Sequence, residues 1–269
     1  MLYTKFMEKY FEKKLTYNQI TFRYAVGESI EKGNEIHPYC EILYFMDGSG
    51  VFLSEQFQEN TQKESMFLIP DGNYHRFQLE NQNNYARLVI TFPRPSIEGE
   101  IVNSLMDEIK IIKDVREEIK ETLKRMAEVL SSSDDSTAVG VYLYGGFLTV
   151  MADLSLFTPS LELPTFTPKN QLISSCIKYI EDNLTENLSV KIIAEEMNVS
   201  EATLFKCFKK NLGISVYKYI LEKRLLMAHK LIRSNKNPTK IYLECGYTDY
   251  PAFYKGYVKM FGHPPSKDK

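Results

Sequence analysis

Cysteine is scarce in this 269-residue sequence, and the four cysteines lie far apart. They are Cys40, Cys176, Cys207 and Cys245, and no two of them form a C-x-x-C pair. This spacing argues against a zinc ribbon, a thioredoxin-like redox site and a disulfide framework. We therefore expect a cytoplasmic protein that works in a reducing environment.

Long apolar runs are also missing. The first 14 residues carry six charged side chains, so they lack the apolar core of a signal peptide. The longest apolar stretch, Ala138 to Ala152, is interrupted by Thr149 and stops at Asp153. It falls short of the ~18 apolar residues that suggest a membrane span, so we expect a buried helix and no membrane partner.

Glycine and proline, at 13 and 11 residues, are too few for a low-complexity chain, and the 43% hydrophobic and 25% charged residues are close to globular averages. A chain of this length fits one large domain or two ordinary ones of ~100 to 200 residues. The segment from Thr158 to Pro168 contains three prolines and no glycine, so it should stay extended. We place a domain linker at residues 158–169.

The net charge of −2 conceals two parts of opposite sign. Residues 170–269 contain 16 Lys and Arg against 10 Asp and Glu, a net of +6, whereas residues 1–169 contain 17 against 25, a net of −8. An acidic part joined to a basic part is the pattern expected when the basic part binds a polyanion.

The basic part contains two copies of one unit. Residues 193–200 align with 241–248 at an offset of 48, and residues 206–213 align with 255–262 at an offset of 49. Each copy is predicted to be a helix, a tight turn and a second helix. The first of these helices is expected at Val190 to Met197.

Turn and capping residues support this prediction in both copies. Asn198 and Gly246 stand just after the first helices, where a left-handed backbone favours Gly or Asn. Ser200 and Thr248 are the expected N-caps of the second helices. The inward-facing residues predicted from helical spacing are Ile192, Ile193, Met197, Leu204, Phe208 and Leu212 in the first copy and Phe253, Tyr257 and Phe261 in the second.

Between the copies, the residues from Val216 to Arg233 follow a helical apolar pattern over 18 residues, or ~27 Å. A helix of this length can hold two recognition helices about 34 Å apart, which is one turn of B-DNA. The outward-facing residues expected to contact double-stranded DNA are Ala202, Thr203, Phe205, Lys206, Lys209, Pro251, Tyr254 and Lys255. One copy alone would fit a solvated helical pair equally well, and the duplication favours DNA binding.

The last 100 residues resemble the DNA-binding region of the AraC/XylS family of transcription regulators, which has two helix-turn-helix units on a connecting helix. Residues 246–265 read GYTDYPAFYKGYVKMFGHPP, similar to the family signature G-F-x-D-x-S-Y-F-x-R-x-F-K-K-x-x-G-x-x-P. Arg224 and Leu225 resemble the Arg-Leu pair of its connecting helix. The resemblance implies that Lys206 and Lys255 occupy positions where the family often places an Arg that contacts bases or phosphates.

The second copy departs from the signature at several positions. Tyr242 stands in place of an alanine, Pro251 and Ala252 in place of Ser-Tyr, Val258 in place of a basic residue, and Asp268 in place of the final aromatic residue. We expect the fold to survive these changes and the bulky Tyr242 to tilt the second unit. The first unit should then carry more of the sequence discrimination.

The N-terminal part is predicted to be a β-domain. Short β-prone runs between Ile42 and Phe92 are separated by Gly-containing and Asn-rich turns, which favours a small barrel or jelly roll. Residues 37–48, which begin HPYCE, and residues 70–75, which read PDGNYH, resemble the two cupin motifs. The resemblance implies a cupin-like sensor domain of the kind that precedes many DNA-binding regions of the family.

A pocket inside this barrel is the expected site for a small polar effector. The residues expected to bind it are Tyr24, His37, Tyr39, Glu41, Tyr44 and His75. His37, Tyr39 and Glu41 would face one way if they lay on one strand. Tyr39 stands where a metal-binding cupin has its second His, so we expect no metal and no organic cofactor. The family resemblance implies a sugar or a related metabolite as the commonest effector class.

Two helical segments follow the predicted barrel. Residues 97–130 are rich in charge, and their expected apolar face consists of Ile101, Leu105, Ile109, Ile112, Ile119, Leu123 and Met126. Residues 139–156 are expected to form a largely apolar helix. The two segments offer more apolar surface than a barrel flank needs, so we expect a homodimer, with packing inside one chain as an open alternative for either helix.

These features predict an α+β multidomain protein: a cupin-like sensor barrel at residues 1–96, dimerisation helices at 97–157, a linker at 158–169 and an all-α DNA-binding domain with two helix-turn-helix units at 170–269. The leading hypothesis is a transcription regulator that binds promoter DNA and a small-molecule effector, with RNA polymerase as a further partner. It has no catalytic residues, since no nucleophile or phosphate-loop motif is recognisable. Two alternatives stay open: a metal-dependent cupin enzyme fused to a DNA-binding tail, and a ligand-independent dimeric regulator.

Overall fold

The computed structural model describes residues 10–27, 35–55, 57–80, 85–97, 99–134, 136–157, 171–234 and 238–268. By its internal contacts the chain divides into two compact units. The first comprises Met1–Glu35, Tyr39–Leu53 and Gln58–Thr167, and the second comprises Ile36–Pro38, Ser54–Phe57 and Pro168–Lys269. The predicted linker at 158–169 and the Asn-rich turn at 81–84 lie outside the described residues.

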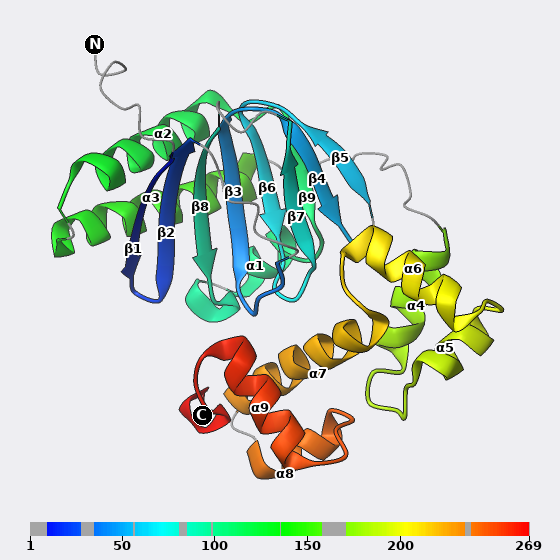
Figure 1. Ribbon diagram of the computed structural model, residues 1–269. Coiled ribbons are helices and arrows are strands. Elements are labelled where there is room, and N and C mark those ends of the chain that lie inside the picture. Colours follow the sequence, from blue (N-terminus) through cyan, green and yellow to red (C-terminus); the bar gives the residue numbers. More distant parts are fainter. Residues whose placement is uncertain are drawn as a thin grey trace. The chain divides into compact units, whose positions relative to one another are not determined.

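The first unit is built on two sheets (Figure 1). Its strands are β1 (Tyr10–Tyr17), β2 (Ile20–Gly27), β3 (Cys40–Asp47), β4 (Gly50–Ser54), β5 (Gln58–Thr61), β6 (Ser65–Ile69), β7 (His75–Leu79), β8 (Ala86–Phe92) and β9 (Lys110–Ile112). One sheet has six antiparallel strands in the order β1-β2-β8-β3-β6-β9, and the other has three in the order β5-β4-β7.

Alternation along β3 gives the six-stranded sheet two different faces. Ile42 and Tyr44 point to one face, where they join a core cluster with Leu123 and Phe147. Those partners belong to α2 (Glu117–Ser132) and α3 (Thr137–Phe157), which lie side by side against this face in Figure 1. Helix α1 (Gly99–Leu105) and the short η1 (Arg94–Ser96) complete the helical layer.

The opposite face packs against the three-stranded sheet through aromatic rings. Phe45 of β3 lies 5.8 Å from Phe77 of β7, and Phe52 of β4 lies 4.9 Å from Phe67 of β6, measured between ring centroids. These rings fill the space between the two sheets, as in a small barrel whose interior is occupied by side chains.

Strand β3 contains a β-bulge where it meets β8. Phe45 pairs with Arg87, and the next paired residue, Asp47, pairs with Ala86, so β3 has one extra residue here. Met46 and Asp47 therefore break the regular alternation of the strand.

The prediction of a continuous helix over residues 97–130 is wrong. The chain forms α1, then the strand β9, and then α2. Ile111 of β9 pairs with Phe67 at the edge of the six-stranded sheet. This pairing joins residues that are distant in sequence, so the local apolar spacing of Ile109 and Ile112 resembles a helix although the backbone is extended.

The prediction of an apolar buried helix over residues 139–156 is confirmed by α3. Among the described residues, α3 is the helix that is long and apolar enough to cross a membrane by length and composition alone. However, one side of it, including Leu143, Phe147 and Val150, is buried in the core cluster of the first unit. It is therefore packed as a core helix.

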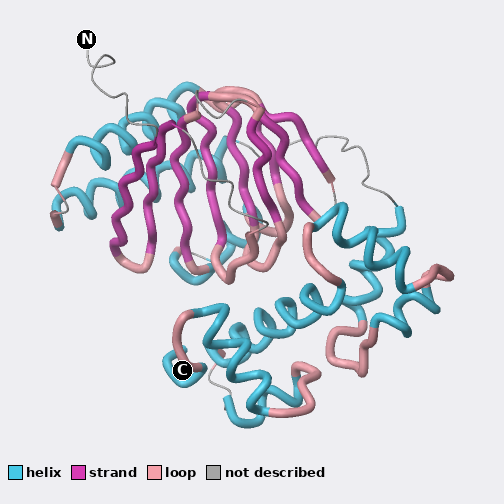
Figure 2. The backbone as a smooth tube through the Cα atoms, viewed as in Figure 1, coloured by secondary structure: helices cyan, strands magenta, loops and turns pink. Residues whose placement is uncertain are grey.

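From residue 171 onward the second unit is helical between short turns (Figure 2). Its helices are α4 (Gln171–Asp182), α5 (Val190–Glu196), α6 (Glu201–Leu212), α7 (Val216–Arg233), α8 (Pro238–Glu244), α9 (Tyr250–Phe261) and the short η2 (Pro265–Asp268). The bounds of α7 are those predicted for the connecting helix. Helices α4, α5 and α6 gather at its N-terminal end and α8 and α9 at its C-terminal end (Figure 1).

Candidate functional site

The first helix-turn-helix consists of α5 and α6. Asn198 in the turn has a φ of 52°, the left-handed conformation predicted for it. Ser200 caps α6, because its Oγ accepts a hydrogen bond of 3.1 Å from the Thr203 backbone N–H. Gly213 then ends α6 with a φ of 70°. Residues next to α6 in the sequence thus determine the turn before this helix and both of its ends.

The predicted inward face of α6 is confirmed. Its buried residues include Leu204, Phe208 and Leu212. Phe208 meets Tyr219 of α7 edge-on, with 5.6 Å between ring centroids. The prediction for Ile192 is wrong, since this side chain is 39% exposed. The short α5 turns Ile193 and Ala194 inward instead.

The outer face of α6 is open to solvent. It carries the residues predicted to contact DNA from this copy, namely Ala202, Thr203, Phe205, Lys206 and Lys209. The Phe205 side chain is 51% exposed, although it is a large aromatic ring. This face offers ammonium groups for phosphates and apolar and hydroxyl groups for base edges.

The second helix-turn-helix consists of α8 and α9. Gly246 in its turn has a φ of 76°, as its position predicts. The prediction of Thr248 as the N-cap is wrong, because Asp249 caps α9 by accepting a hydrogen bond of 2.8 Å from the Ala252 N–H. The extra residue that changes the offset between the copies from 48 to 49 therefore lies before the cap, so Asp249 is the counterpart of Ser200.

Helix α9 repeats the division into a buried and an exposed face. Phe253 and Tyr257 are buried as predicted, and Phe261 is half-buried. The predicted DNA-contacting residues Pro251, Tyr254 and Lys255 are all exposed.

Tyr242, which stands where the family has an alanine, packs inside an aromatic cluster. Its ring centroid lies 5.6 Å from that of Tyr250 and 6.4 Å from that of Phe253. The bulky ring thus fills space between α8 and α9. The expected tilt of the second unit stays a prediction.

Arg224 connects three segments of the second unit. The side chain is only 8% exposed and lies on α7. Its guanidinium donates hydrogen bonds to the carbonyls of Leu184 at 2.9 Å, Glu186 at 2.6 Å and Gly246 at 2.7 Å. Burial lowers the pKa of this guanidinium. Arg224 therefore ties the turn of the second copy to the segment that precedes α5 in the first.

Asp268, which replaces the final aromatic residue of the signature, also has a structural role. Its Oδ2 accepts a hydrogen bond of 2.6 Å from the Tyr257 hydroxyl, and its Oδ1 lies 3.6 Å from Nε2 of His229 on α7. His229 in turn stacks on Phe261, with 4.7 Å between ring centroids. The carboxylate thus joins η2, α7 and α9.

The six predicted ligand-binding residues do not converge on one point. Tyr44 and Tyr24 pack with the core cluster on the helical side of the six-stranded sheet. Glu41 has the opposite parity on β3 and faces His75 of β7, with 3.9 Å between Glu41 Oε2 and His75 Nε2. The sheet therefore separates Tyr24 and Tyr44 from Glu41 and His75.

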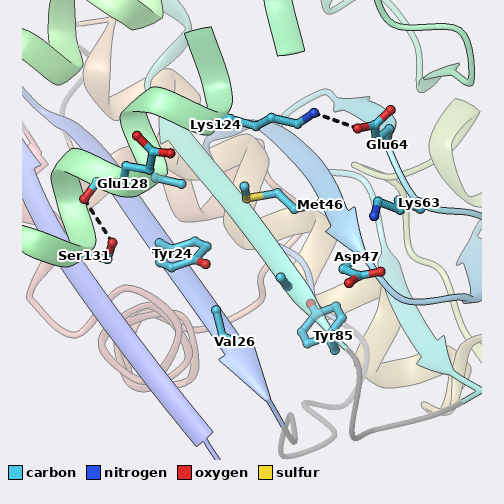
Figure 3. A pocket seen from close by; sticks show the side chains of 12 residues that line it. Tyr24, Val26, Met46, Asp47, Lys63, Glu64, Tyr85, Lys124, Glu128 and Ser131 are labelled. Atoms are coloured by element: carbon cyan, nitrogen blue, oxygen red, sulfur yellow. Dashed lines mark hydrogen bonds and ion pairs between the residues drawn. The ribbon is translucent and has the colours of Figure 1, made fainter. Parts of the chain in front are cut away.

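A cavity of about 520 Å³ opens on the helical side of this sheet (Figure 3). Its lining residues are Tyr24, Val26, Met46, Asp47, Lys63, Glu64, Tyr85, Ala86, Lys124, Ala127, Glu128 and Ser131. Lys124 donates a hydrogen bond of 2.7 Å to Glu64 across the rim. Hydrogen bonds from Lys124 and Lys120 lower the pKa of Glu64. The cavity combines two tyrosine rings with charges of both signs.

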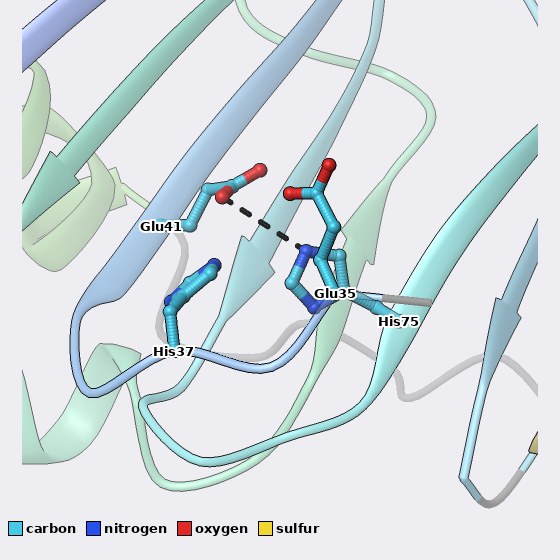
Figure 4. A group of neighbouring side chains, drawn as sticks. All are labelled: Glu35, His37, Glu41 and His75. Carbon is cyan, nitrogen blue, oxygen red and sulfur yellow. Dashed lines mark ion pairs between the residues drawn. The ribbon is translucent and has the colours of Figure 1, made fainter. Parts of the chain in front are cut away.

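Glu41 and His75 belong to a second polar group, which also contains Glu35 and His37 (Figure 4). One ligand atom from each of these side chains lies within 4.8 Å of the others. Tyr39 is 39% exposed. The expectation that His37, Tyr39 and Glu41 lie on one strand is wrong, because the chain bends at residues 38–39 and β3 begins at Cys40.

Two family profiles match the chain. A profile for an AraC-like ligand binding domain matches residues 23–141, and a profile for a helix-turn-helix domain matches residues 193–269. The chain belongs to the AraC family of transcription regulators. This membership confirms the predicted fold class and a function as a DNA-binding transcription regulator with an N-terminal ligand-binding domain.

Curated relatives of this AraC-family chain include bacterial operon regulators. It is 23% identical, over 91% of its length, to the lactose operon transcription activator of Staphylococcus xylosus, of which it covers 83%. It is also 23% identical, over 87% of its length, to the raffinose operon transcriptional regulatory protein RafR of Pediococcus pentosaceus, of which it covers 86%. Among solved structures it is similar to ToxT from Vibrio cholerae, at 12% identity, 96% coverage of each chain and a TM-score of 0.41.

Sequence reasoning missed several residues of these sites in the AraC-family chain. Glu35 precedes His37 by two residues, which was the available signal that it belongs to the same polar group. Lys63 and Lys124 line the cavity of Figure 3 from a loop and from α2. Nothing in their local sequence separates them from other surface lysines.

Proposed function

We propose that this AraC-family regulator binds promoter DNA through the outer faces of α6 and α9 and responds to a small polar metabolite of the sugar class. The observation that carries the DNA-binding part is the pair of capped helices that each bury one apolar stripe and expose the other face. Ala202, Thr203, Phe205, Lys206 and Lys209 would make the contacts of the first helix. Pro251, Tyr254 and Lys255 would make those of the second.

The cavity of Figure 3 is the proposed effector site. Its volume of about 520 Å³ falls in the range of ~300 to 1,000 Å³ that is usual for small-molecule sites. A polyhydroxylated ligand needs both donors and acceptors around it, and Lys63, Asp47 and Glu128 supply them beside the rings of Tyr24 and Tyr85. Two relatives are named as lactose and raffinose operon regulators, which supports the sugar class.

A homodimer is proposed through the exposed face of α3. This face carries Val141, Leu148 and Leu156, of which Leu156 is 68% exposed, with the small Gly145 and Ala152 between them. An apolar stripe with small residues allows close approach of a second copy of the helix. We expect Leu148→Glu to convert a dimer into a monomer in sedimentation experiments, whereas the polar position Thr149→Ser on the same face should leave the dimer intact.

The remaining aspects of the proposal follow from this role. The protein would act in the cytoplasm, where promoters and RNA polymerase are present, and RNA polymerase would be a further partner. No covalent step is needed, because occupancy of the effector site and the contacts with DNA are both binding equilibria.

Selection of binding sites from random duplexes with the full chain tests the DNA-binding proposal. We expect a defined consensus for the wild type, relaxed preference at one position for Lys206→Ala, and uniformly weaker binding for Lys209→Ala. Loss of one phosphate contact should flatten the salt dependence by ~1 unit of slope. Lys113→Ala in the first unit is the matched control, and equal binding by all four proteins would contradict the assignment of this face.

A thermal-shift panel of mono-, di- and trisaccharides tests the effector proposal. A sugar that raises the melting temperature of the wild type should do so less for Lys63→Ala and for Tyr24→Phe, because these residues line the cavity. If no sugar changes the melting temperature, the ligand-independent regulator is favoured instead.

A further inference from the structure

We propose that Glu35, His37, Glu41 and His75 form a binding site for one divalent transition-metal ion, which lies apart from the proposed effector cavity. Their ligand atoms, one per side chain, lie within 4.8 Å of one another, and the side chains point toward a common centre in Figure 4. Glu41 and His75 are buried, and Glu35 and His37 are half-buried. The group therefore has an enclosed side and an accessible side, as an ion site needs.

The positions of these residues are fixed by backbone pairing. Glu35 forms an isolated antiparallel bridge with His75, with N–H to carbonyl distances of 2.8 and 3.0 Å in the two directions. Glu41 lies near the start of β3, in the six-stranded sheet, and His75 opens β7, in the three-stranded sheet. His37 lies two residues from Glu35 and two from Tyr39, so connectivity keeps its backbone close to theirs.

The protonation of His75 is directed by its second ring nitrogen. Nδ1 lies 3.1 Å from the backbone carbonyl of Asn73, and a carbonyl oxygen can only accept a hydrogen bond. In the neutral ring the proton is therefore on Nδ1, and the lone pair is on Nε2, the atom that lies 3.9 Å from Glu41 Oε2. A histidine that donates one N–H to a carbonyl and presents the other nitrogen to an ion is the usual arrangement at metal sites.

The donor set selects the class of ion. Two imidazole nitrogens with two carboxylates suit zinc and the neighbouring first-row divalent ions, whereas magnesium and calcium prefer oxygen alone. Two carboxylates this close repel each other, and a divalent cation between them removes that repulsion. In a tetrahedral zinc site the ligand atoms lie roughly 3.5 Å apart, so small side-chain rotations would close the group on the ion.

Glu35 adds a donor that the cupin-like motif does not contain. The sequence argued against a metal because Tyr39 stands at the second histidine position. In the structure the Tyr39 side chain is 39% exposed, and Glu35 supplies a fourth donor from outside the motif. Because Glu41 and His75 belong to different sheets, a bound ion would link the two sheets at this end of the barrel.

The test uses the full-length chain after removal of metals with a chelator, and Co²⁺ and Zn²⁺ as probes. Co²⁺ should bind with a stoichiometry of one and give a visible d–d absorption spectrum that reports coordination by nitrogen and oxygen. Zn²⁺ should displace it and raise the melting temperature of the protein. Glu41→Gln and His75→Gln should each weaken Co²⁺ binding by about 100-fold or more.

Two further variants make the experiment decisive. Glu35→Gln changes a half-buried side chain and should weaken Co²⁺ binding even if the two buried variants fail to fold. Glu100→Gln, an exposed carboxylate on α1, and His263→Gln in the second unit should bind Co²⁺ as the wild type does. The proposal is overturned if the wild type shows no d–d spectrum with excess Co²⁺, or if the Glu35→Gln spectrum and affinity match those of the controls.

DNA binding and sugar response of the same preparations keep this inference separate from the proposed function. A protein that selects its operator and responds to a sugar but binds no Co²⁺ would overturn the metal site alone. A protein that binds Co²⁺ but selects no DNA sequence would leave the metal site standing.

Discussion

The two helix-turn-helix units have the same local construction and different surroundings. Each has a left-handed residue in its turn, an N-cap on its second helix and a left-handed glycine at its end. The first uses Asn198 and Ser200, and the second uses Gly246 and Asp249. The second is further tied by Arg224 to the rest of the unit and by Asp268 to α7.

This difference distinguishes the residues that form each helix-turn-helix from the residues that position it in the second unit. Caps, turn residues and buried stripes suffice to form either helix pair, and they tolerate the departures of the second copy from the family signature. The placement of one copy relative to the other depends instead on buried hydrogen bonds from α7. We expect changes at these bonds to be the most damaging.

The largest effect is expected for Arg224→Ala. It leaves three backbone carbonyls without their charged donor, so the free energy of unfolding should fall by about 3 to 5 kcal/mol. DNA affinity should fall as well, because the two recognition helices lose their fixed spacing. Urea unfolding of the full chain measures the first effect, and the exposed Lys218→Ala on the same helix is the control. A change below about 0.5 kcal/mol would show that Arg224 does not hold the two copies together.

A smaller effect is expected in the turns. Gly246→Ala should cost about 2 to 3 kcal/mol, because alanine is strained at a φ of 76° and its Cβ would lie 2.8 Å from the Arg224 guanidinium carbon. The matched change in the first copy, Asn198→Gly, should stabilise slightly, since glycine favours this conformation. Thermal unfolding measures both variants. A melting temperature of Gly246→Ala equal to that of the wild type would contradict the expected strain in the second turn.

Variants on the proposed DNA-contacting faces of α6 and α9 should differ in how much DNA affinity they lose. Lys206→Ala should weaken binding to the selected operator by about 1 to 3 kcal/mol, and Lys255→Ala should weaken it less, as expected if the first unit carries more of the discrimination. Fluorescence anisotropy over a range of salt concentrations measures both. A larger loss for Lys255→Ala would assign the main readout to the second unit.

The smallest effect is expected at the caps, where the two copies should behave alike. Ser200→Ala and Asp249→Ala should each cost about 1 kcal/mol of stability, since each removes one N-cap hydrogen bond. Thr248→Ala should be close to neutral. If Thr248→Ala lost as much stability as Asp249→Ala, Thr248 would be the N-cap of α9, as the alignment of the two copies predicts.

The second unit was more predictable from sequence than the first because its contacts are mostly local. The bounds of α7, the left-handed turns and the buried stripes all follow from spacings within one helix or turn. Asp249 was missed as a cap only because the inserted residue was placed after it in the alignment.

The first unit depends on pairings that the local sequence does not encode. Ile112 fits a helical spacing as well as an extended one, and its place is decided by the pairing of β9 with β6. Glu35 meets His75 through a bridge that joins distant parts of the chain. Tyr44 and Glu41 were grouped by chemistry, but their opposite parity on β3 sends them to different faces.

The extra residue in β3 bears on the ligand selectivity of the proposed effector cavity. In a regular strand, neighbouring side chains point to opposite faces. Substitutions that change the ligand preference of the cavity could then be made only at every second position. The bulge brings both Met46 and Asp47 to the cavity rim. Two neighbouring residues, one apolar and one charged, can thus be substituted together. New ligand specificities could be engineered there without repacking Ile42 or Tyr44, which lie beneath the helices.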